Sequence, residues 1–428
     1  GDGEFGPTSD QDIIKCGYYY GNGSAANGPS INLGFEPQWV FMKNSDQPFD
    51  NWILVDNMRG IGASGPTTDD DYDLNPNSSN SESPNNIMTL TPNGFKITSS
   101  ASRYNGNSNT MIYIAIRRGP MAVPEDATDV FAVATGNSGA NPDLTSGFPV
   151  DFAILRENFS ASQNPLVGSR LQGANRLKTP TTDTESAESA FQWDFMDGWF
   201  DGSALNSGDI SWMWRRAPSF CDVVAWEGSG TSGYEYVDHN LGATPEMIWF
   251  KNRDSSTTPR GNWYVYHKDL ANSNGYVYLN STSAEATDYP GWATGSIPFS
   301  DTRFVVQKSR LSYSGESYIA YLFASIDGVS KVGSFTGNGS STGDSQDIDC
   351  GFSSGARFVL VKAISSPGAW FLFDTERGIV AGNDSHLSLN SDAAEDTSRD
   401  LIDPLNSGFT INYHSDWGNQ LNGNGQTY

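Results

Sequence analysis

Hydrophobic residues in this chain gather in short runs that come in pairs. The first pair covers residues 39–42 and 52–55, each run ends in a charged residue, Lys43 or Asp56, and a polar loop joins them. Two such runs predict a β-hairpin of two buried strands. The same pattern returns three more times, at residues 152–169, 247–267 and 358–374. Four copies of one hairpin predict four tandem domains.

Further strand patterns surround each hairpin. An aromatic strand broken by Gly-Asn-Gly precedes the first copy at 18–24, and two more strand patterns follow it at 93–97 and 111–116. Strand and turn formers are abundant, and no stretch keeps a 3.6-residue apolar period. We therefore predict an all-β chain of four tandem antiparallel β-sandwich repeats, jelly-roll or lectin-like, with very little helix.

The repeat pattern sets the domain boundaries. Residues 1–14 are expected to be a leader or the end of an upstream segment, and residues 120–127, with two prolines, a stiff linker. The repeats span residues 15–119, 128–218 (the divergent copy), 219–328 and 329–428.

Repeat 4 lacks its last strand in this sequence, because residues 425–428 align with the beginning of the closing strand of repeat 3. A sandwich without a core strand exposes an edge, so we expect the natural polypeptide to continue.

The net charge of the chain limits the classes of molecule that it is expected to bind. A formal net charge of −25 repels phosphate backbones and anionic lipid, so we expect no nucleic-acid binding. No apolar run approaches the ~20 residues of a membrane span, which argues against membrane insertion. Cys16, Cys221 and Cys350 have no zinc-site spacing and are expected to be bystander thiols, with a bridge between repeats as the alternative.

No catalytic residues are predicted. The four histidines are scattered over repeats 3 and 4, without the spacing of a metal site. A sandwich glycosidase needs two facing carboxylates, and the nearest cluster, at 183–188, lies in a polar loop. A glycan depolymerase is therefore kept only as the third hypothesis.

One acidic run is a candidate metal site. Asp69, Asp70, Asp71 and Asp73 offer the clustered carboxylates that calcium prefers, but the run lacks the glycine and final glutamate of a calcium loop. A solvated acidic loop is the simpler interpretation. Structural calcium is the one cofactor that the sequence suggests.

The tryptophans fall into two groups. Five lie inside hairpin strands and are predicted to be core residues: Trp39, Trp52, Trp249, Trp263 and Trp370. Three others, Trp199, Trp292 and Trp417, are flanked by Asp, Gly or Pro in apparent loops, where a ring can stack on a sugar. These three are the candidate ligand-binding residues, and the alternative is that they cap the ends of the sandwiches.

The hairpin charges are a third group of candidates. A basic residue ends the first strand and a polar one ends the second, as in Lys43 with Asp56 or Lys362 with Asp374. A structural ion pair or a charge at the rim is expected in preference to a ligand contact.

The segments 230–267, 333–340 and 370–378 resemble a repeat domain in virion proteins of marine bacteriophages, and the resemblance extends over nearly the whole chain. It implies a structural or tail-fibre-like protein at the virion surface. The leading hypothesis is a non-enzymatic adhesin, expected to be a homo-oligomer, that binds host surface glycans through variable loops. The alternative is a purely structural virion component, such as a capsid decoration, baseplate or filament subunit, whose partners are other virion proteins.

Overall fold

The chain is almost entirely β-structure, as the sequence predicts. The computed structural model describes residues 12–62, 71–119, 122–136, 140–202, 208–288, 291–292, 297–417 and 420–428. Within these residues the helices are short: α1 (Ser102–Asn105), α2 (Lys308–Leu311) and the 3₁₀ turns η1 (Ala127–Asp129) and η2 (Arg170–Gln172). Of the described helices, none has the length and apolar character needed to cross a membrane.

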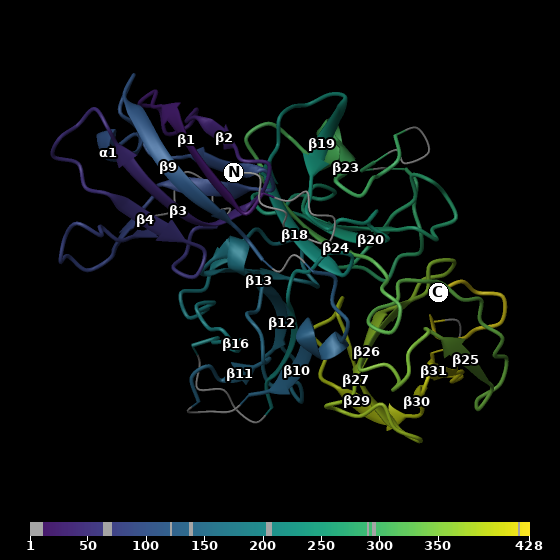
Figure 1. The fold of residues 1–428 in the computed structure, drawn as a ribbon. Coiled ribbons are helices and arrows are strands. Elements are labelled where there is room, and N and C mark those ends of the chain that lie inside the picture. Colours follow the sequence, from purple (N-terminus) through teal and green to yellow (C-terminus); the bar gives the residue numbers. More distant parts are fainter. Residues whose placement is uncertain are drawn as a thin grey trace.

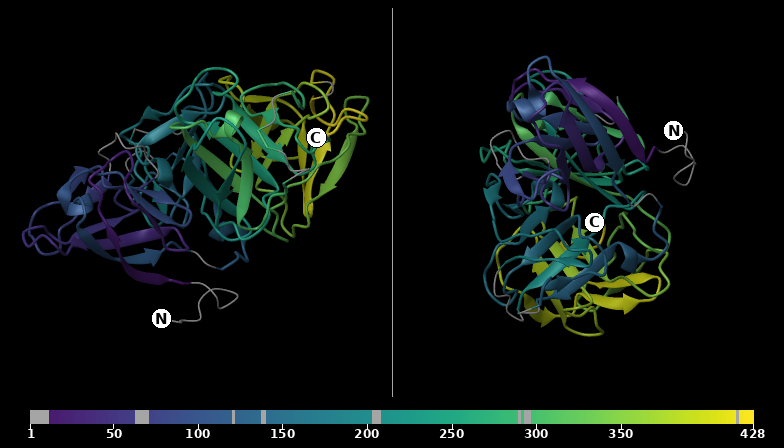
Figure 2. Two further views of the ribbon diagram at one scale, coloured as in Figure 1. Left: turned by 90° about the horizontal axis from the view of Figure 1, so that it is seen from above. Right: turned by 60° about the vertical axis from the view of Figure 1, so that its left-hand side comes forward.

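Repeat 1 forms two main antiparallel sheets at one end of the molecule (Figures 1 and 2). The larger sheet has the order β1 (Ile14–Tyr20), β9 (Thr110–Arg117), β3 (Pro37–Asn44) and β4 (Ile53–Asp56). The second sheet contains β2 (Ser30–Asn32), β8 (Gly94–Ile97) and β7 (Met88–Thr91). A short pair, β5 (Asp71–Asp73) and β6 (Ser83–Asn85), continues beyond β4 through a bridge between Leu54 and Leu74.

Repeats 2 and 3 have the same arrangement. The larger sheet of repeat 2 is β10 (Phe131–Thr135), β17 (Ile210–Trp214), β12 (Phe152–Arg156), β13 (Leu166–Ser169), β14 (Asn175–Lys178) and β15 (Ser186–Ala187), opposed by β11 (Leu144–Thr145) and β16 (Gly198–Trp199). That of repeat 3 is β18 (Cys221–Glu227), β24 (Ser317–Phe323), β20 (Met247–Asn252), β21 (Trp263–His267) and β22 (Val277–Tyr278), opposed by β19 (Tyr234–Asp238) and β23 (Arg303–Gln307).

Repeat 4 keeps the hairpin but differs beside it. Its sheets are β26 (Phe358–Lys362), β27 (Trp370–Asp374), β28 (Asp384–Ser388) and β29 (Asp396–Arg399), and β25 (Ser345–Asp349), β31 (Gly408–Asn412) and β30 (Ile402–Leu405). In the other repeats the closing strand, β9, β17 or β24, lies between the first strand and the hairpin. In the described part of repeat 4 that place holds only Thr427 and Tyr428, which pair with Thr336, Phe335 and Ile364.

The hairpin sheet of each repeat has two apolar faces. One face packs against the second sheet of the same repeat, as Ile248 and Phe250 pack with Phe304. We call the opposite side the outer face. In repeat 3 it carries Trp249 and Trp263, both essentially buried. Side chains alternate between the faces with period two, so runs that are apolar throughout indicate that both faces are covered.

The outer faces of repeats 2, 3 and 4 meet, and one repeated set of contacts closes these repeats into a ring. In each of these repeats, the cationic side chain at the end of the first hairpin strand donates a hydrogen bond to a loop carbonyl of a neighbouring repeat. The pairs are Lys251 Nζ with Thr182 O at 3.4 Å, Lys362 Nζ with Thr282 O at 3.5 Å, and Arg156 Nη2 with Asp392 O at 2.9 Å. Repeat 3 thus contacts repeat 2, repeat 4 contacts repeat 3, and repeat 2 contacts repeat 4.

Backbone hydrogen bonds follow the same cycle. The N–H of a loop glutamate donates to a carbonyl just beyond the partner's first hairpin strand, at 2.8 Å each time: Glu185 to Arg253, Glu285 to Ile364 and Glu395 to Phe159. Two indole N–H groups add to it, Trp263 to Lys178 O and Trp370 to Tyr278 O, both at 2.9 Å. Three head-to-tail contacts in one sense make a closed ring of three sandwiches.

The hairpin tryptophans differ in burial, although the sequence predicts a core position for all five. Trp249, Trp263 and Trp370 are buried, so their predicted core position is confirmed. Trp39 and Trp52 of repeat 1 are only half-buried, and their core prediction is wrong because repeat 1 lies outside the ring.

The hairpin charges do not meet across the strands. In repeat 1, Asp56 is paired with Trp39, and Lys43 lies at the opposite end of the hairpin. Asp56 instead binds Arg59 three residues later, at 2.6 Å, and Asp374 binds Arg377 in the same way. Of the two expected alternatives, the Lys–Asp ion pair is therefore wrong for this hairpin, because the residues that end two successive antiparallel strands lie at its opposite ends.

The ring lysines predict an unusual alkaline effect. Burial lowers the pKa of Lys251 and Lys362 to about 8, from 10.5. Between pH 8 and 9.5 the unfolded chain keeps protons that the folded lysines have lost, so the free energy of unfolding rises with pH. We expect about 1.5 kcal/mol per lysine over this interval.

Urea titrations at each pH measure this effect. The double variant Lys251→Met/Lys362→Met should lose the rise relative to the unmodified chain, while Lys43→Met, at the same position of repeat 1, should keep it. Comparing variants removes the opposing titration of tyrosines and cysteines. Equal slopes in all three proteins would contradict the prediction.

Candidate interaction surface

Two of the three tryptophans proposed to contact a ligand are inside the protein. Trp199 lies in β16, stacks on Trp193 at 4.9 Å, and donates its indole N–H to Ser211 Oγ at 3.1 Å. Trp292 packs on Phe250 at 5.3 Å. Both rings are essentially buried, so neither face is open to a sugar, and the stacking prediction is wrong for these two. Both are core residues instead.

Trp417 is different because it is only half-buried. It contacts Phe371 edge-on, with ring centroids 5.2 Å apart, and the guanidinium of Arg399 lies 5.5 Å from its ring. Arg399 also pairs with Asp416 at 3.1 Å. Of the three candidates, Trp417 alone keeps an accessible edge near charged hydrogen-bonding groups, and its ligand role stays a prediction.

The aspartates proposed to hold calcium are used by the protein itself. Asp71 Oδ2 accepts the N–H groups of Ile87 and Met88 at 2.8 and 2.9 Å, and Asp73 accepts Ser83 and Asn85 side chains. Both carboxylates are buried. Asp69 and Asp70 lie outside the described residues.

Asp384 of repeat 4 repeats the Asp71 bonds, accepting the N–H groups of Leu401 and Ile402 at 2.9 Å each. Burial raises the pKa of Asp384 to about 6. Because Asp71 and Asp384 accept equivalent backbone N–H groups, both carboxyl groups have a structural role in their repeats. Across the described ranges, no three His, Cys, Asp or Glu side chains are grouped as a metal site requires.

Two of the histidines, His239 and His386, are buried. His239 packs beside Phe304 and contacts Ser300 O, while His386 lies among Phe371, Phe373 and Trp417. Burial lowers the pKa of both, that of His386 to about 4, so they are neutral core residues at pH 7. The three cysteines are free thiols, and no bridge joins the repeats through them.

A buried cluster of charges joins repeats 1, 2 and 3. The guanidinium of Arg216 makes a bidentate pair with Glu36 at 2.7 and 3.0 Å, and lies 3.5 Å from Asp151 and 3.7 Å from Asp222. Arg118 adds pairs with Glu36 and Asp222. Burial acts to lower the pKa of Arg216, but the carboxylates of Glu36, Asp151 and Asp222 outweigh it and raise the pKa above its ordinary value.

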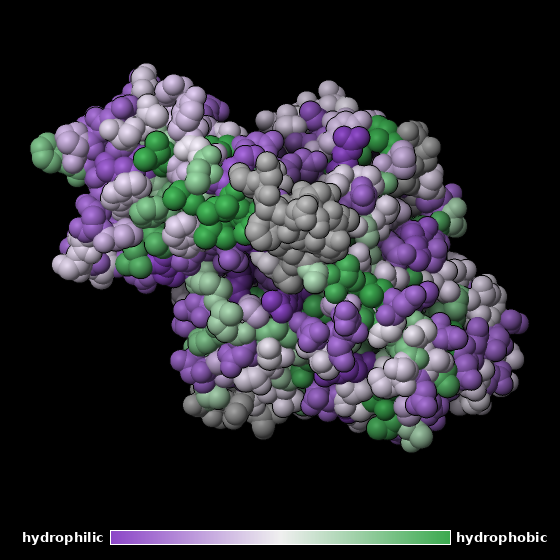
Figure 3. Space-filling view, in the orientation of Figure 1, coloured by the Kyte–Doolittle hydropathy of each residue, from purple (hydrophilic) through white to green (hydrophobic). Residues whose placement is uncertain are grey.

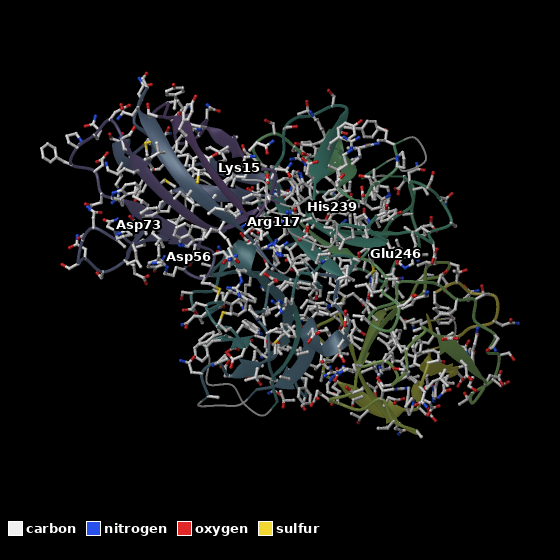
Figure 4. The ribbon with its side chains drawn as sticks, viewed as in Figure 1. Lys15, Asp56, Asp73, Arg117, His239 and Glu246 are labelled. Atoms are coloured by element: carbon white, nitrogen blue, oxygen red, sulfur yellow. The ribbon has the colours of Figure 1, made fainter. Side chains whose placement is uncertain are left out.

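A shallow hollow opens beside this cluster, lined by Glu36, Arg117, Arg118, Ala217, Pro218 and Asn240. Figure 4 places Arg117 where repeat 1 meets the ring, away from Asp56 and Asp73 on the outer parts of repeat 1. The pairs of the cluster connect Glu36 and Arg118 of repeat 1 with residues of repeats 2 and 3.

The ring leaves the outer face of repeat 1 uncovered. Its most exposed side chains are Tyr18 (62%), Tyr20 (62%), Ile14 (57%) and Ile112 (38%), and half-buried neighbours complete it: Trp39, Phe41, Trp52, Leu54, Ile114 and Ile116. Phe41 stacks between Trp39 and Trp52, with centroids 5.7 and 4.7 Å away. Figure 3 shows hydrophobic side chains gathered over this sheet, at the upper left.

Several counterparts of these residues in repeats 2 and 3 are buried. The strand registers place Trp39 level with Phe152, Phe41 with Ile154 and Trp249, and Ile114 with Trp212 and Tyr321. Every one of those ring residues is at most 1% exposed. A contiguous apolar patch of this kind on a protein surface marks an interaction site. The sequence signal for this face is the run of consecutive apolar residues in each hairpin strand, which places apolar side chains on both faces of the sheet.

The comparisons with known proteins identify the family without naming an activity. A search of curated proteins and a search of solved structures each found no match. One family model matches residues 10–120 and 130–428, which is nearly the whole chain. The chain therefore belongs to the family described as a domain of unknown function, DUF7483.

Proposed function

We propose that this chain is a non-enzymatic structural subunit of a virion surface, which joins other subunits through the outer face of repeat 1. The observation that carries the proposal is the exposure of aromatic residues there, while the residues of repeats 2 and 3 that correspond to Phe41 and Ile114 are buried where the repeats meet. A face that serves three times as a protein interface is chemically suited to a fourth.

The rest of the molecule suits a rigid building block. Ring contacts join repeats 2, 3 and 4, and the Arg216 cluster holds repeat 1 against them. The placement in a virion rests on the sequence resemblance. Glycan binding by the same subunit is a second candidate, favoured by the partly open ring of Trp417 beside Arg399 and Asp416.

Sedimentation velocity of the purified chain tests the proposal. The chain is expected to self-associate at micromolar concentration, and Tyr18→Ser/Phe41→Ser should abolish association without changing the circular dichroism spectrum. Tyr236→Ser is the matched control, because Tyr236 is 51% exposed but lies on β19 of repeat 3. A monomer at 100 µM would overturn the proposal.

A glycan array separates the second candidate. Binding that is lost in Trp417→Ala but kept in Tyr18→Ser/Phe41→Ser would assign an adhesin role to repeat 4. Absence of binding leaves the structural role alone.

A further inference from the structure

Repeat 1 contains residues equivalent to those that join repeats 2, 3 and 4 into the ring. A hydrogen bond found in repeats 1, 3 and 4 shows which residues correspond. The backbone N–H of Trp52 donates to Asn77 Oδ1 at 3.0 Å, as Trp263 does to Asn280 and Trp370 to Asn390. Counting from these asparagines, Ser79 corresponds to Thr282 and Asp392, and Glu82 corresponds to Glu285 and Glu395. Those counterparts are the residues that accept the ring cations or donate a backbone N–H.

The cation and the indole of the ring are also present in repeat 1. Lys43 Nζ donates to Asn44 O at 2.6 Å, as Lys251 does to Asn252 O at 2.9 Å within repeat 3. Lys251 also donates to repeat 2, whereas Lys43 donates to Asn44 O and Gln47 O within its own hairpin. Trp52 occupies the place of Trp263 and Trp370, whose indoles cross to the next repeat.

The outer faces of the ring also show how such surfaces pack. Phe152 of repeat 2 lies 4.9 Å from Tyr321 of repeat 3, and Phe358 of repeat 4 lies 5.5 Å from Phe131 of repeat 2, measured between ring centroids. Aromatic side chains therefore fill the interior of the ring. Trp39, Phe41 and Ile114 would supply the same filling from repeat 1.

We propose that three copies of this chain associate head to tail through repeat 1, forming a second ring with the contacts of the ring made by repeats 2, 3 and 4. Each Lys43 would approach Ser79 O of the next copy, each Glu82 N–H would donate to Ser45 O, and each Trp52 indole to Asn75 O. This inference rests on the proposed assembly function and adds its stoichiometry and geometry.

The number three follows from the fold. A head-to-tail contact repeats until its rotation closes, and in this chain the contact of these sandwiches closes after three. A face-to-face dimer would leave the lysine, glutamate and indole positions without their carbonyl partners. The ring geometry satisfies all of them.

Mass measurement of the full chain is the first test. The complex should have three times the chain mass of 46.4 kDa. Because a central interface tryptophan is a typical hot spot, Trp52→Ala should raise the dissociation constant about 100-fold. Lys43→Glu should weaken association as well, since a carboxylate would face Ser79 O. Tyr236→Ser should leave the mass and affinity unchanged, and circular dichroism confirms that each variant is folded.

A disulfide tests the geometry. Glu185 N donates to Arg253 O across the ring, and the corresponding positions in repeat 1 are Glu82 and Ser45. In a Cys16→Ser background, Ser45→Cys/Glu82→Cys should oxidise to a covalent trimer. Within one chain the two positions are separated by about three strand spacings, roughly 14 Å, which is too far for a disulfide. Ser45→Cys alone should give no trimer.

The outcomes separate this inference from the proposed function. A dimer, or a covalent ladder longer than three, would overturn the closed ring while leaving assembly through the outer face intact. A trimer unaffected by Trp52→Ala would overturn the ring geometry. A monomer at every concentration would overturn both.

Discussion

Replacing Arg216 with methionine is expected to lower the free energy of unfolding by about 3–5 kcal/mol, the usual cost of leaving a buried carboxylate without its partner. Arg216 is 1% exposed and holds Glu36 in a bidentate pair at 2.7 and 3.0 Å. Methionine keeps most of the volume, so the loss reports charge and hydrogen bonding instead of a cavity.

The charge balance of this cluster explains the size of the effect. The carboxylates of Glu36, Asp151 and Asp222 face the guanidinium groups of Arg118, Arg170 and Arg216. Removing one guanidinium leaves a net negative charge away from water. The N–H groups of Arg216 also bind Val223 O at 2.9 Å, so one substitution loosens repeats 1, 2 and 3 together.

Urea unfolding followed by tryptophan fluorescence measures the loss. Arg59→Met is the matched control, because the Arg59–Asp56 pair is partly exposed and is expected to contribute less than about 1 kcal/mol. Adding Glu36→Gln to Arg216→Met should recover about 1–2 kcal/mol by removing the uncompensated charge. A loss from Arg216→Met no larger than that from Arg59→Met would refute the role given to the cluster.

The fold could be predicted from the sequence because its signal is local and repeated. Each hairpin is marked by two apolar runs, and the structure pairs them as expected, for example Val40 with Val55 and Val359 with Phe373. The separation of Lys43 from Asp56 could also have been deduced, since residues that end successive antiparallel strands lie at opposite ends of the hairpin.

The candidate site could not be predicted because burial of an outer face depends on distant contacts. Trp52 and Trp263 each follow an asparagine and begin an apolar run, yet Trp263 is buried by repeat 2 and Trp52 is not. For Trp199 the error is the reverse, because the sequence predicts an accessible loop residue and the ring is buried. Its Asp and Gly neighbours indicate a turn, but they do not determine on which side of the sheet the ring lies.

Completing the sheet of repeat 4 is expected to have the second large effect. When residues 319–325 are appended after Tyr428, the added strand should raise the free energy of unfolding of repeat 4, because its backbone can pair with β26 and its side chains can cover the half-buried Phe358 and Leu360. Tyr428 corresponds to Tyr318, because Phe335 pairs with Tyr428 as Trp226 pairs with Tyr318. The appended residues therefore continue in the register of β24.

Incomplete burial of β26 side chains indicates the place where this strand would lie. Phe358 and Leu360 are half-buried, whereas their counterparts Phe152, Ile154 and Trp249 are at most 1% exposed. Ile364 N donates to Thr427 O at 2.9 Å, as Arg253 N does to Ser317 O. Alternate residues of an antiparallel strand bond to the same side, so the backbones of Phe358, Leu360 and Lys362 face the open place.

Hydrogen exchange gives the sharpest readout, because β26 contains its own control. The amides of Leu360 and Lys362 should exchange at least 100-fold more slowly in the extended chain, while Val359 and Val361, already bonded to β27, should change little. An extension with the same composition but shifted by one residue places its apolar side chains on the wrong faces and should not protect them. If the correct extension leaves the Leu360 amide as fast as the shifted one does, the open place in repeat 4 is not a strand site.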